Sequence, residues 1–465
     1  MNAALMTFEE FSLFPDIEMF PGRDAGFTSV SIDSRQIKPG ALFVALIGAV
    51  QDGHKFIEAA LAAGAAGIMA ARSRLDSFDI LNLVKKWGKT LLVAEDTLRC
   101  LQKTAKIYLE KFPNLLKIAI TGSSGKTTTK EIAAAIIGQE KNTIMNSGNM
   151  NSETGLPLSV FNVRSEHEVG IFEAGMNRRG EIAELAEVLK PNIALITNIG
   201  SAHIGILGST AAIAEEKKNI FSQFSGKQKA LIPSGDPFRS FLCEGVAGEV
   251  RLYGNNDFPE LELVSEGIEG LTLKWAGEPV NFPLPGVFNL RNIVSALAIA
   301  REIPVSDKAV RKGLESVKPL FGRSEILKGN VTVIRDCYNS NPESLEEVLS
   351  SCDSFEWRGR KVYVIGSMLE LGDISEEAHV NMGRRLAASK ADLIFLYGVE
   401  TEKAAEVLVS CKIPFYRTVE MNELRDMLKT YINSGDLVLV KGSRGCAMEE
   451  LTGVLLPDFI PAGGH

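Results

Sequence analysis

The sequence predicts an α/β protein of three domains built largely on doubly wound parallel sheets. Short apolar segments suited to buried strands recur along the chain, and helix-length segments separate them. The chain has 465 residues, which is too long for one ordinary core and fits about three domains. Hydrophobic residues make up 45% and charged residues 23%, values typical of a globular protein that buries substantial cores.

The first predicted domain, residues 1–112, has mixed α and β character. The apolar run 41–46 predicts a strand, the alanine-rich stretch 56–66 a helix, and 89–95 another strand. The second domain, 113–318, alternates strands and helices, which predicts a doubly wound parallel sheet. Its expected strands are 116–120, 169–173, 193–199 and 229–232.

The third predicted domain, 319–465, repeats this alternation and should form a second Rossmann-like sheet. A short linker near 317–322 is a candidate hinge. The expected strands of this domain are 331–334, 361–365, 393–396 and 437–440.

The charge and cysteine content exclude several classes of protein. A formal net charge of -8 argues against nucleic-acid and anionic-membrane binding, so an anionic substrate must be held by local groups. The six cysteines show neither metal-ligand spacing nor a disulfide framework. The N-terminus lacks a basic start followed by a long apolar run, and no run of eighteen apolar residues occurs. We therefore expect a cytoplasmic protein without signal peptide or membrane span.

The most specific motif lies in residues 117–131, where an apolar strand leads through a glycine turn into a helix. Such a turn aims backbone N–H groups at an anion, and a lysine and a hydroxyl complete a nucleotide and magnesium site. Ile120 stands where the generic phosphate loop has glycine, so the loop has the shortened form Thr-Gly-x-x-Gly-Lys-Thr. We expect ATP or GTP to bind at Gly122, Ser123, Ser124, Gly125, Lys126, Thr127 and Thr128.

Three further polar residues follow predicted strands of the second domain. Glu173 ends one strand, His203 follows the next, and Lys217 lies on a later amphipathic helix beside Lys218. Ligands of parallel sheets bind at the carboxyl ends of the strands, so these side chains could gather near the phosphate loop. Each alone is more often structural or solvated, and their joint order after the loop favours the functional interpretation.

These motifs, together with Phe288-Asn-Leu-Arg-Asn292, resemble the Mur ligases over nearly the whole chain. Mur ligases are the ATP-dependent amide-forming enzymes of peptidoglycan precursor synthesis. Segments 336–342, 366–372 and 441–445 are most similar to the member that joins D-alanyl-D-alanine to UDP-N-acetylmuramoyl-tripeptide. The resemblance implies that ATP phosphorylates the tripeptide carboxylate and that the dipeptide amine then attacks the acyl phosphate.

The resemblance also implies roles for individual residues, with ATP and Mg²⁺ as cofactors. The catalytic residues would be Lys126, Glu173, His203 and Lys217, and the metal region would comprise Thr127, Glu173, His203 and a carbamylated Lys217. Further ATP contacts would come from Asn289, Asn292, Arg323 and Asp336. The uridine nucleotide would meet Ser31, Asp33, Ser34, Arg35, Asp52 and His54; the muramoyl peptide Asn151 and Thr154; and the dipeptide Tyr338, Asn339 and Asn341.

Simpler interpretations remain open for two of these groups. An ordinary turn held by a salt bridge is the alternative for residues 31–35, and turn chemistry is the alternative for the asparagines before Pro342. At the level of the whole chain, a folylpolyglutamate synthase is the enzymatic alternative, and a nucleotide-binding switch protein and a noncatalytic scaffold are the others. We expect a monomer whose domains are open without ligand and close for catalysis.

Overall fold

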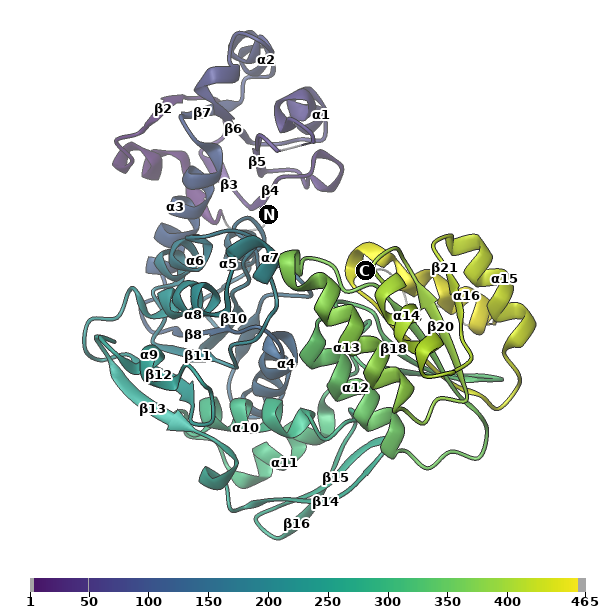
Figure 1. Cartoon of the computed structure of the whole chain (residues 1–465). Helices are drawn as coiled ribbons and strands as arrows, with labels where there is room; N and C mark the ends of the chain where they lie inside the picture. The colour runs from purple at the N-terminus through teal and green to yellow at the C-terminus, as the bar shows by residue number, and fades with distance from the viewer. Residues whose placement is uncertain (1–3, 49, 459–465) are drawn as a thin grey trace.

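A computed structural model describes residues 4–48 and 50–458, and its helices and strands form the predicted α/β architecture (Figure 1). The N-terminal region holds a five-stranded sheet in the order β2-β7-β6-β5-β4, in which only β2 is antiparallel to its neighbour. β1 and β3 form a separate antiparallel pair. The bounds are β1 (Met6–Thr7), β2 (Ile17–Phe20), β3 (Gly26–Phe27), β4 (Ser29–Ser31), β5 (Ala41–Val44), α1 (Ile57–Ala62), β6 (Gly67–Ala71), α2 (Ile80–Trp87), β7 (Thr90–Ala94) and α3 (Thr97–Glu110).

The central region is a six-stranded, all-parallel sheet in the order β13-β12-β11-β8-β10-β9. Its main strands are apolar throughout because helices cover both faces. Alternate residues point to opposite faces: Ala119 packs in one core with α3, α5 and α6, whereas Ile118 and Ile120 pack in another with α4, α10 and α11. The bounds are β8 (Leu116–Thr121), α4 (Lys126–Ile137), β9 (Thr143–Met145), α5 (Gly155–Val160), β10 (Val169–Glu173), α6 (Glu181–Leu189), β11 (Ile193–Ile196), α7 (Ile204–Leu207), α8 (Thr210–Lys218), β12 (Lys229–Pro233), α9 (Arg239–Cys243), β13 (Glu249–Tyr253), α10 (Asn289–Ala300) and α11 (Asp307–Ser316).

A small antiparallel sheet, β14-β15-β16, extends this region and was not among the predicted strands. It comprises β14 (Leu261–Gly267), β15 (Gly270–Trp275) and β16 (Glu278–Phe282). Every second residue of β15 is buried, so one face packs against the core that contains α10 and α11 while the other remains more accessible.

The C-terminal region repeats the doubly wound arrangement in a six-stranded sheet of order β17-β18-β22-β19-β20-β21. Only the edge strand β17 runs antiparallel to its neighbour. The bounds are β17 (Glu325–Lys328), β18 (Thr332–Asp336), α12 (Pro342–Ser354), β19 (Lys361–Gly366), α13 (Ser375–Ala387), β20 (Leu393–Tyr397), α14 (Glu402–Ser410), β21 (Tyr416–Thr418), α15 (Met421–Tyr431), β22 (Leu437–Lys441) and α16 (Thr452–Leu455).

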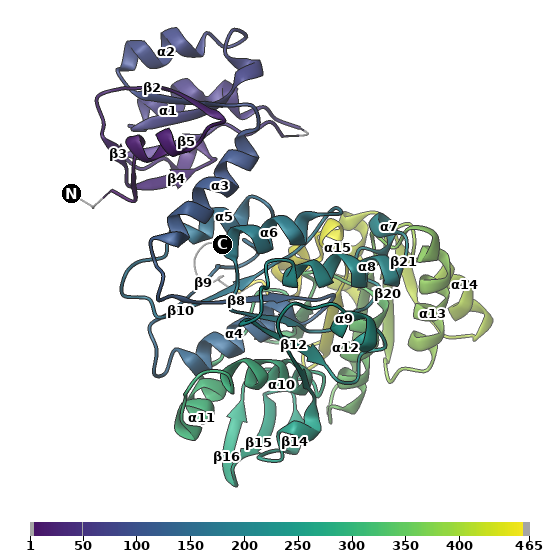
Figure 2. The same cartoon turned by 90° about the vertical axis from the view of Figure 1, so that its left-hand side faces the viewer.

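The three regions are arranged so that the central and C-terminal sheets lie beside each other, while the N-terminal region projects from one end (Figures 1 and 2). Helix α3 leads from the projecting region into the central one. The central and C-terminal regions are joined by Ser201, whose backbone N–H and hydroxyl donate to Glu343 at 3.0 and 2.7 Å. Gly205 donates its N–H to the Glu370 carbonyl at 3.0 Å.

The fold class is confirmed, and several expected elements differ only in length. The strand expected at 193–199 ends at Ile196, because Thr197 and Asn198 turn to hold the phosphate loop. The helix expected at 56–66 covers only Ile57–Ala62. All six cysteines are unpaired. No helix within residues 4–48 and 50–458 is long and apolar enough to cross a membrane. The domain boundaries at 112 and 318 stay a prediction.

Candidate active site

A polar cleft of about 470 Å³ lies between the central and C-terminal regions. Many of the predicted site residues line it, although they come from distant parts of the chain. They are Ser123, Ser124, Gly125, Lys126, Thr127, Thr128, Asn151, Glu173, His203, Asn289, Asn292, Arg323, Asp336, Tyr338, Asn339 and Asn341.

The phosphate loop connects β8 to α4, which begins at Lys126. Gly122 and Gly125 have φ angles of +152° and +75°, which favour glycine. Gly125 lies next to the first turn of α4, where free backbone N–H groups and the helix dipole favour an anion. The local geometry of the loop is therefore that of a phosphate site.

Two residues after β11 hold this loop. The Thr197 hydroxyl donates to the Ser124 carbonyl at 2.6 Å, and the Asn198 side-chain carbonyl accepts the N–H groups of Ser123 and Ser124 at 3.2 and 2.9 Å. Sequence reasoning did not assign these two residues. Their position immediately after a buried strand was the available signal.

We predict that Gly125→Ala weakens binding of an ATP analogue by tenfold or more. An alanine Cβ would lie 2.2 Å from the Asn292 Oδ1 atom, and the left-handed conformation adds about 1–2 kcal/mol of strain. Calorimetric titration measures the effect. Gly435→Ala is the matched control, because Gly435 has a φ of +87° and no atom within 4 Å of the added Cβ. Equal affinity of the Gly125 variant and the wild type would contradict the prediction.

Lys126 folds back over its own loop. Its Nζ donates to the Gly122 carbonyl at 2.8 Å, with the Ser123 carbonyl at 3.4 Å. Burial lowers the pKa of the Lys126 ammonium, and the Glu173 carboxylate opposes this shift. The loop thus places a lysine near a carboxylate and beside a site suited to phosphate.

Glu173 is almost fully buried at the carboxyl end of β10. Asn151 donates to its Oε1 atom at 2.6 Å, and Asn146 fixes its backbone. Its Oε2 atom is buried without a hydrogen-bond partner in the described part of the chain. A buried carboxylate oxygen is costly unless it is paired or ligates a cation, so this atom fits a metal ligand.

His203 and Lys217 lie on the same side of the central sheet but differ in their surroundings. His203 lines the cleft with a φ of +67°, and its Nδ1 atom lies 3.2 Å from Glu370 Oε2 without hydrogen-bond geometry. Lys217 is 1% exposed, does not line the cleft, and has Met176 Sδ at 4.0 Å. Burial and the Lys126 charge hold the pKa of Lys217 well below its ordinary value. No ready-made cluster of three His, Cys, Asp or Glu ligands exists among the residues described.

The C-terminal wall is organised around Asp336, at the end of β18. Its Oδ1 atom accepts the Ser324 N–H at 2.8 Å, and its Oδ2 atom accepts Lys441 Nζ at 2.7 Å. Lys441 ends β22, directly opposite Asp336 in the strand register, and also donates to the Asn339 carbonyl at 3.2 Å. Arg323 stacks over the Tyr338 ring at 4.1 Å. Lys441 was quoted in a motif but not assigned to the site.

The asparagines of both walls have structural partners. Asn341 caps α12 by accepting the Ser344 N–H at 2.8 Å, and Asn339 accepts the Ser340 N–H at 2.8 Å. Asn289 donates to the Pro285 carbonyl at 2.8 Å and accepts from Asn292 at 2.9 Å. Turn and cap chemistry therefore describes these side chains, and their contacts with ATP or dipeptide stay a prediction.

The predicted uridine-nucleotide residues lie in the N-terminal region and do not line the cleft. Arg35 and Asp33 form an ion pair at 2.8 Å, as in the simpler interpretation. His54 is buried: Nδ1 contacts Asp52 at 2.6 Å and Nε2 accepts the Ala71 N–H at 2.9 Å. Both imidazole nitrogens are thus used within the protein, and their roles toward substrate stay predictions. The remaining residues outside the cleft lining are Ser31, Ser34, Thr154 and Gly122.

The fold and the phosphate loop define a nucleotide-binding α/β protein with a two-domain cleft. The Mur ligase middle domain matches residues 120–300, the glutamate ligase domain of Mur ligases residues 322–444, and the Mur ligase family catalytic domain residues 26–84. The chain belongs to the Mur ligase family, as the sequence motifs predicted.

Individual relatives extend this similarity over the whole length. A Treponema pallidum protein named "UDP-N-acetylmuramoyl-tripeptide--D-alanyl-D-alanine ligase" is 41% identical over 92% of this chain and 94% of its own. The crystal structure of MurF from Acinetobacter baumannii has a TM-score of 0.81 at 29% identity, covering 93% of this chain and 94% of that one. MurF ligase from Thermotoga maritima in complex with ADP has a TM-score of 0.76 at 28% identity, covering 92% and 96%.

Proposed function

We propose that this chain is an ATP-dependent ligase that joins D-alanyl-D-alanine to UDP-N-acetylmuramoyl-tripeptide. The products are UDP-N-acetylmuramoyl-pentapeptide, ADP and phosphate, and the setting is cytoplasmic peptidoglycan precursor synthesis by a monomer. The observation that carries the proposal is the single cleft in which the phosphate loop and Glu173 face the Asp336–Lys441 wall. Relatives named for this reaction match more than nine-tenths of the chain, the N-terminal region included.

The cleft offers groups suited to both steps of the reaction. In the first, a carboxylate oxygen of the tripeptide forms a bond to the γ-phosphorus as the bond to ADP breaks. Lys126 and the N–H groups at the start of α4 would neutralise charge on the phosphates, so that two anions can approach. In the second, the dipeptide nitrogen attacks the acyl carbon and loses a proton, and phosphate departs. Tyr338 and its neighbours would shape the dipeptide pocket.

Magnesium fits the residues present. Thr127, Glu173, His203 and a carbamylated Lys217 would hold it, and the unpartnered Glu173 Oε2 supports this assignment. Bound there, magnesium supplies positive charge to oxygens that become more negative during phosphoryl transfer. Carbamylation needs a neutral amine, and the lowered pKa of Lys217 provides one.

Phosphate release from ATP and magnesium tests the proposal. Turnover should require both UDP-N-acetylmuramoyl-tripeptide and D-alanyl-D-alanine, and mass spectrometry should find the pentapeptide product. Activity only with glutamate and a folate substrate would identify a folylpolyglutamate synthase instead. Nucleotide binding without turnover on either pair would indicate a switch protein.

We predict that ligands compact the molecule. The predicted uridine-nucleotide residues lie outside the cleft that holds the phosphate loop, so a substrate that spans both must bring the regions together. Small-angle scattering should give a smaller radius of gyration with an ATP analogue plus the UDP substrate than without ligand. Superimposable profiles would contradict domain closure.

A further inference from the structure

Two buried carboxylates, those of Glu181 and Glu216, hold the segments around Glu173 and Lys217 through backbone N–H groups. Glu181 is 1% exposed and Glu216 is 5% exposed. Neither belongs to the site predicted from the sequence. Buried carboxylates are expensive unless fully hydrogen-bonded, which makes their placement informative.

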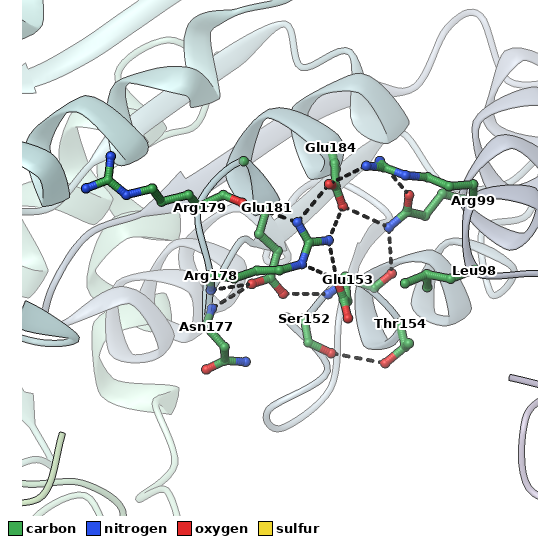
Figure 3. A network of polar contacts seen from close by, with 12 residues as sticks. Leu98, Arg99, Ser152, Glu153, Thr154, Asn177, Arg178, Arg179, Glu181 and Glu184 are labelled. Carbon is green, nitrogen blue, oxygen red and sulfur yellow. Dashed lines mark hydrogen bonds and ion pairs between the residues drawn. The ribbon is translucent and has the colours of Figure 1, made fainter. Parts of the chain in front are cut away.

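Glu181 joins two loops beside β10, as Figure 3 shows. Its Oε2 atom accepts the N–H groups of Asn177 and Arg178 at 2.6 and 3.2 Å, in the loop that follows Glu173. Its Oε1 atom accepts the Glu153 N–H at 3.1 Å, in the loop that carries Asn151. Asn151 in turn donates to Glu173 Oε1 at 2.6 Å. The Glu181 carboxylate thus fixes both the loop after Glu173 and the loop that orients the Glu173 side chain.

Glu216 performs the corresponding task for Lys217. It lies on α8 directly before Lys217, and its carboxylate accepts the Gly180 N–H at 2.8 Å and the Ile182 N–H at 2.9 Å. These donors flank the start of α6, next to the loop that Glu181 holds. The two carboxylates together connect the segment before Lys217 to the segment after Glu173.

A simple helix-capping role does not account for Glu181. A capping carboxylate accepts N–H groups of its own first turn, whereas Glu181 accepts from residues before the helix and from Glu153, 28 positions away. A side-chain network reinforces the same loops, because Arg178 bonds both Glu153 and Glu184, and Glu184 also accepts from Arg99 of α3 at 2.6 Å (Figure 3). The arrangement constrains loops rather than a single helix end.

We infer that Glu181 and Glu216 are positioning residues that set the placement of Glu173 relative to Lys217. The inference rests on the proposed function for its kinetic consequence and on geometry alone for its structural one. Outer groups that orient a site residue typically change activity about 10–100-fold when they are replaced. Small displacements of reacting groups have effects of similar size.

The test uses E181Q and E216Q in the full chain, with E187Q as the matched control. Glu187 lies on the same helix, but its carboxylate pairs only with Lys106, at 2.8 Å, within the described structure. Glutamine keeps the shape but offers one acceptor oxygen, so its NH₂ group would face a backbone donor. We expect kcat to fall about 10–100-fold in E181Q with the KM for ATP within about twofold of wild type, and E187Q to match the wild type.

Amide hydrogen exchange supplies a readout that does not depend on ligase turnover. Exchange at Glu153, Asn177 and Arg178 should accelerate at least tenfold in E181Q, and exchange at Gly180 and Ile182 should accelerate in E216Q. Unchanged exchange at these amides, or a kcat of folded E181Q within twofold of wild type, would overturn the inference. If E181Q does not fold, E216Q carries the same test. A wild-type chain that lacks ligase turnover would count against the proposed function, and exchange would then decide the inference.

Discussion

Lys126→Met should lower kcat by about 10³-fold or more, the size of effect seen when one group that stabilises the transition state in phosphoryl or acyl transfer is lost. The physical reason is charge. Lys126 is the cation of the phosphate loop, its Nζ lies 2.8 Å from the Gly122 carbonyl, and the loop opens into the cleft that Glu173 lines. Methionine retains much of the length and removes the charge. Steady-state phosphate release with all three substrates measures the loss.

Lys141→Met is the control for this prediction. Lys141 pairs with Glu168 at 3.2 Å and lies outside the cleft lining, so its replacement should leave kcat within about twofold of wild type. A Lys126 variant that turns over ATP at a tenth of the wild-type rate or faster would show that the N–H groups of the loop suffice for phosphate binding.

The buried parallel strands were predictable because their signal is local. β10 matches its expected bounds, Val169–Glu173, since a strand covered on both faces needs an uninterrupted apolar run. The antiparallel strands β14–β16 were not predicted, because they are half-exposed and carry charged residues on the open face. The strand order was also inaccessible. The pairing of Asp336 with Lys441 depends on β22 lying beside β18, and these strands are distant in sequence.

The site was predictable where a residue type alone suggests its chemistry. The phosphate loop, Glu173 and His203 were found in this way, and the structure places them along one cleft. Glu181 and Glu216 could not be found, because acidic residues on helices are normally solvated and nothing in their spacing reveals which backbone N–H groups they accept. Residues that act through tertiary contacts leave no local pattern.

Lys217→Met should reduce kcat about 100-fold or more while raising stability near neutral pH, a combination that separates function from folding. Lys217 is 1% exposed, and burial holds its pKa well below the ordinary value. Folding at neutral pH in bicarbonate-free buffer therefore requires this lysine to lose a proton that the unfolded chain binds, which costs free energy. Methionine removes that cost and is accommodated beside Met176.

The pH dependence gives the sign of the effect. Between the lowered folded-state pKa and the unfolded value of about 10.4, the unfolded wild type binds more protons than the native state, so its stability rises with pH. The Lys217 variant lacks this contribution, and its advantage in free energy of unfolding should shrink from pH 7 to pH 10 in urea titrations. Lys218→Met is the control, because Lys218 donates to the Phe241 carbonyl at 2.7 Å and lies over the Phe241 ring. Its turnover should remain close to wild type; loss of activity in the Lys218 variant with retention in the Lys217 variant would reverse the assignment of the two neighbouring lysines.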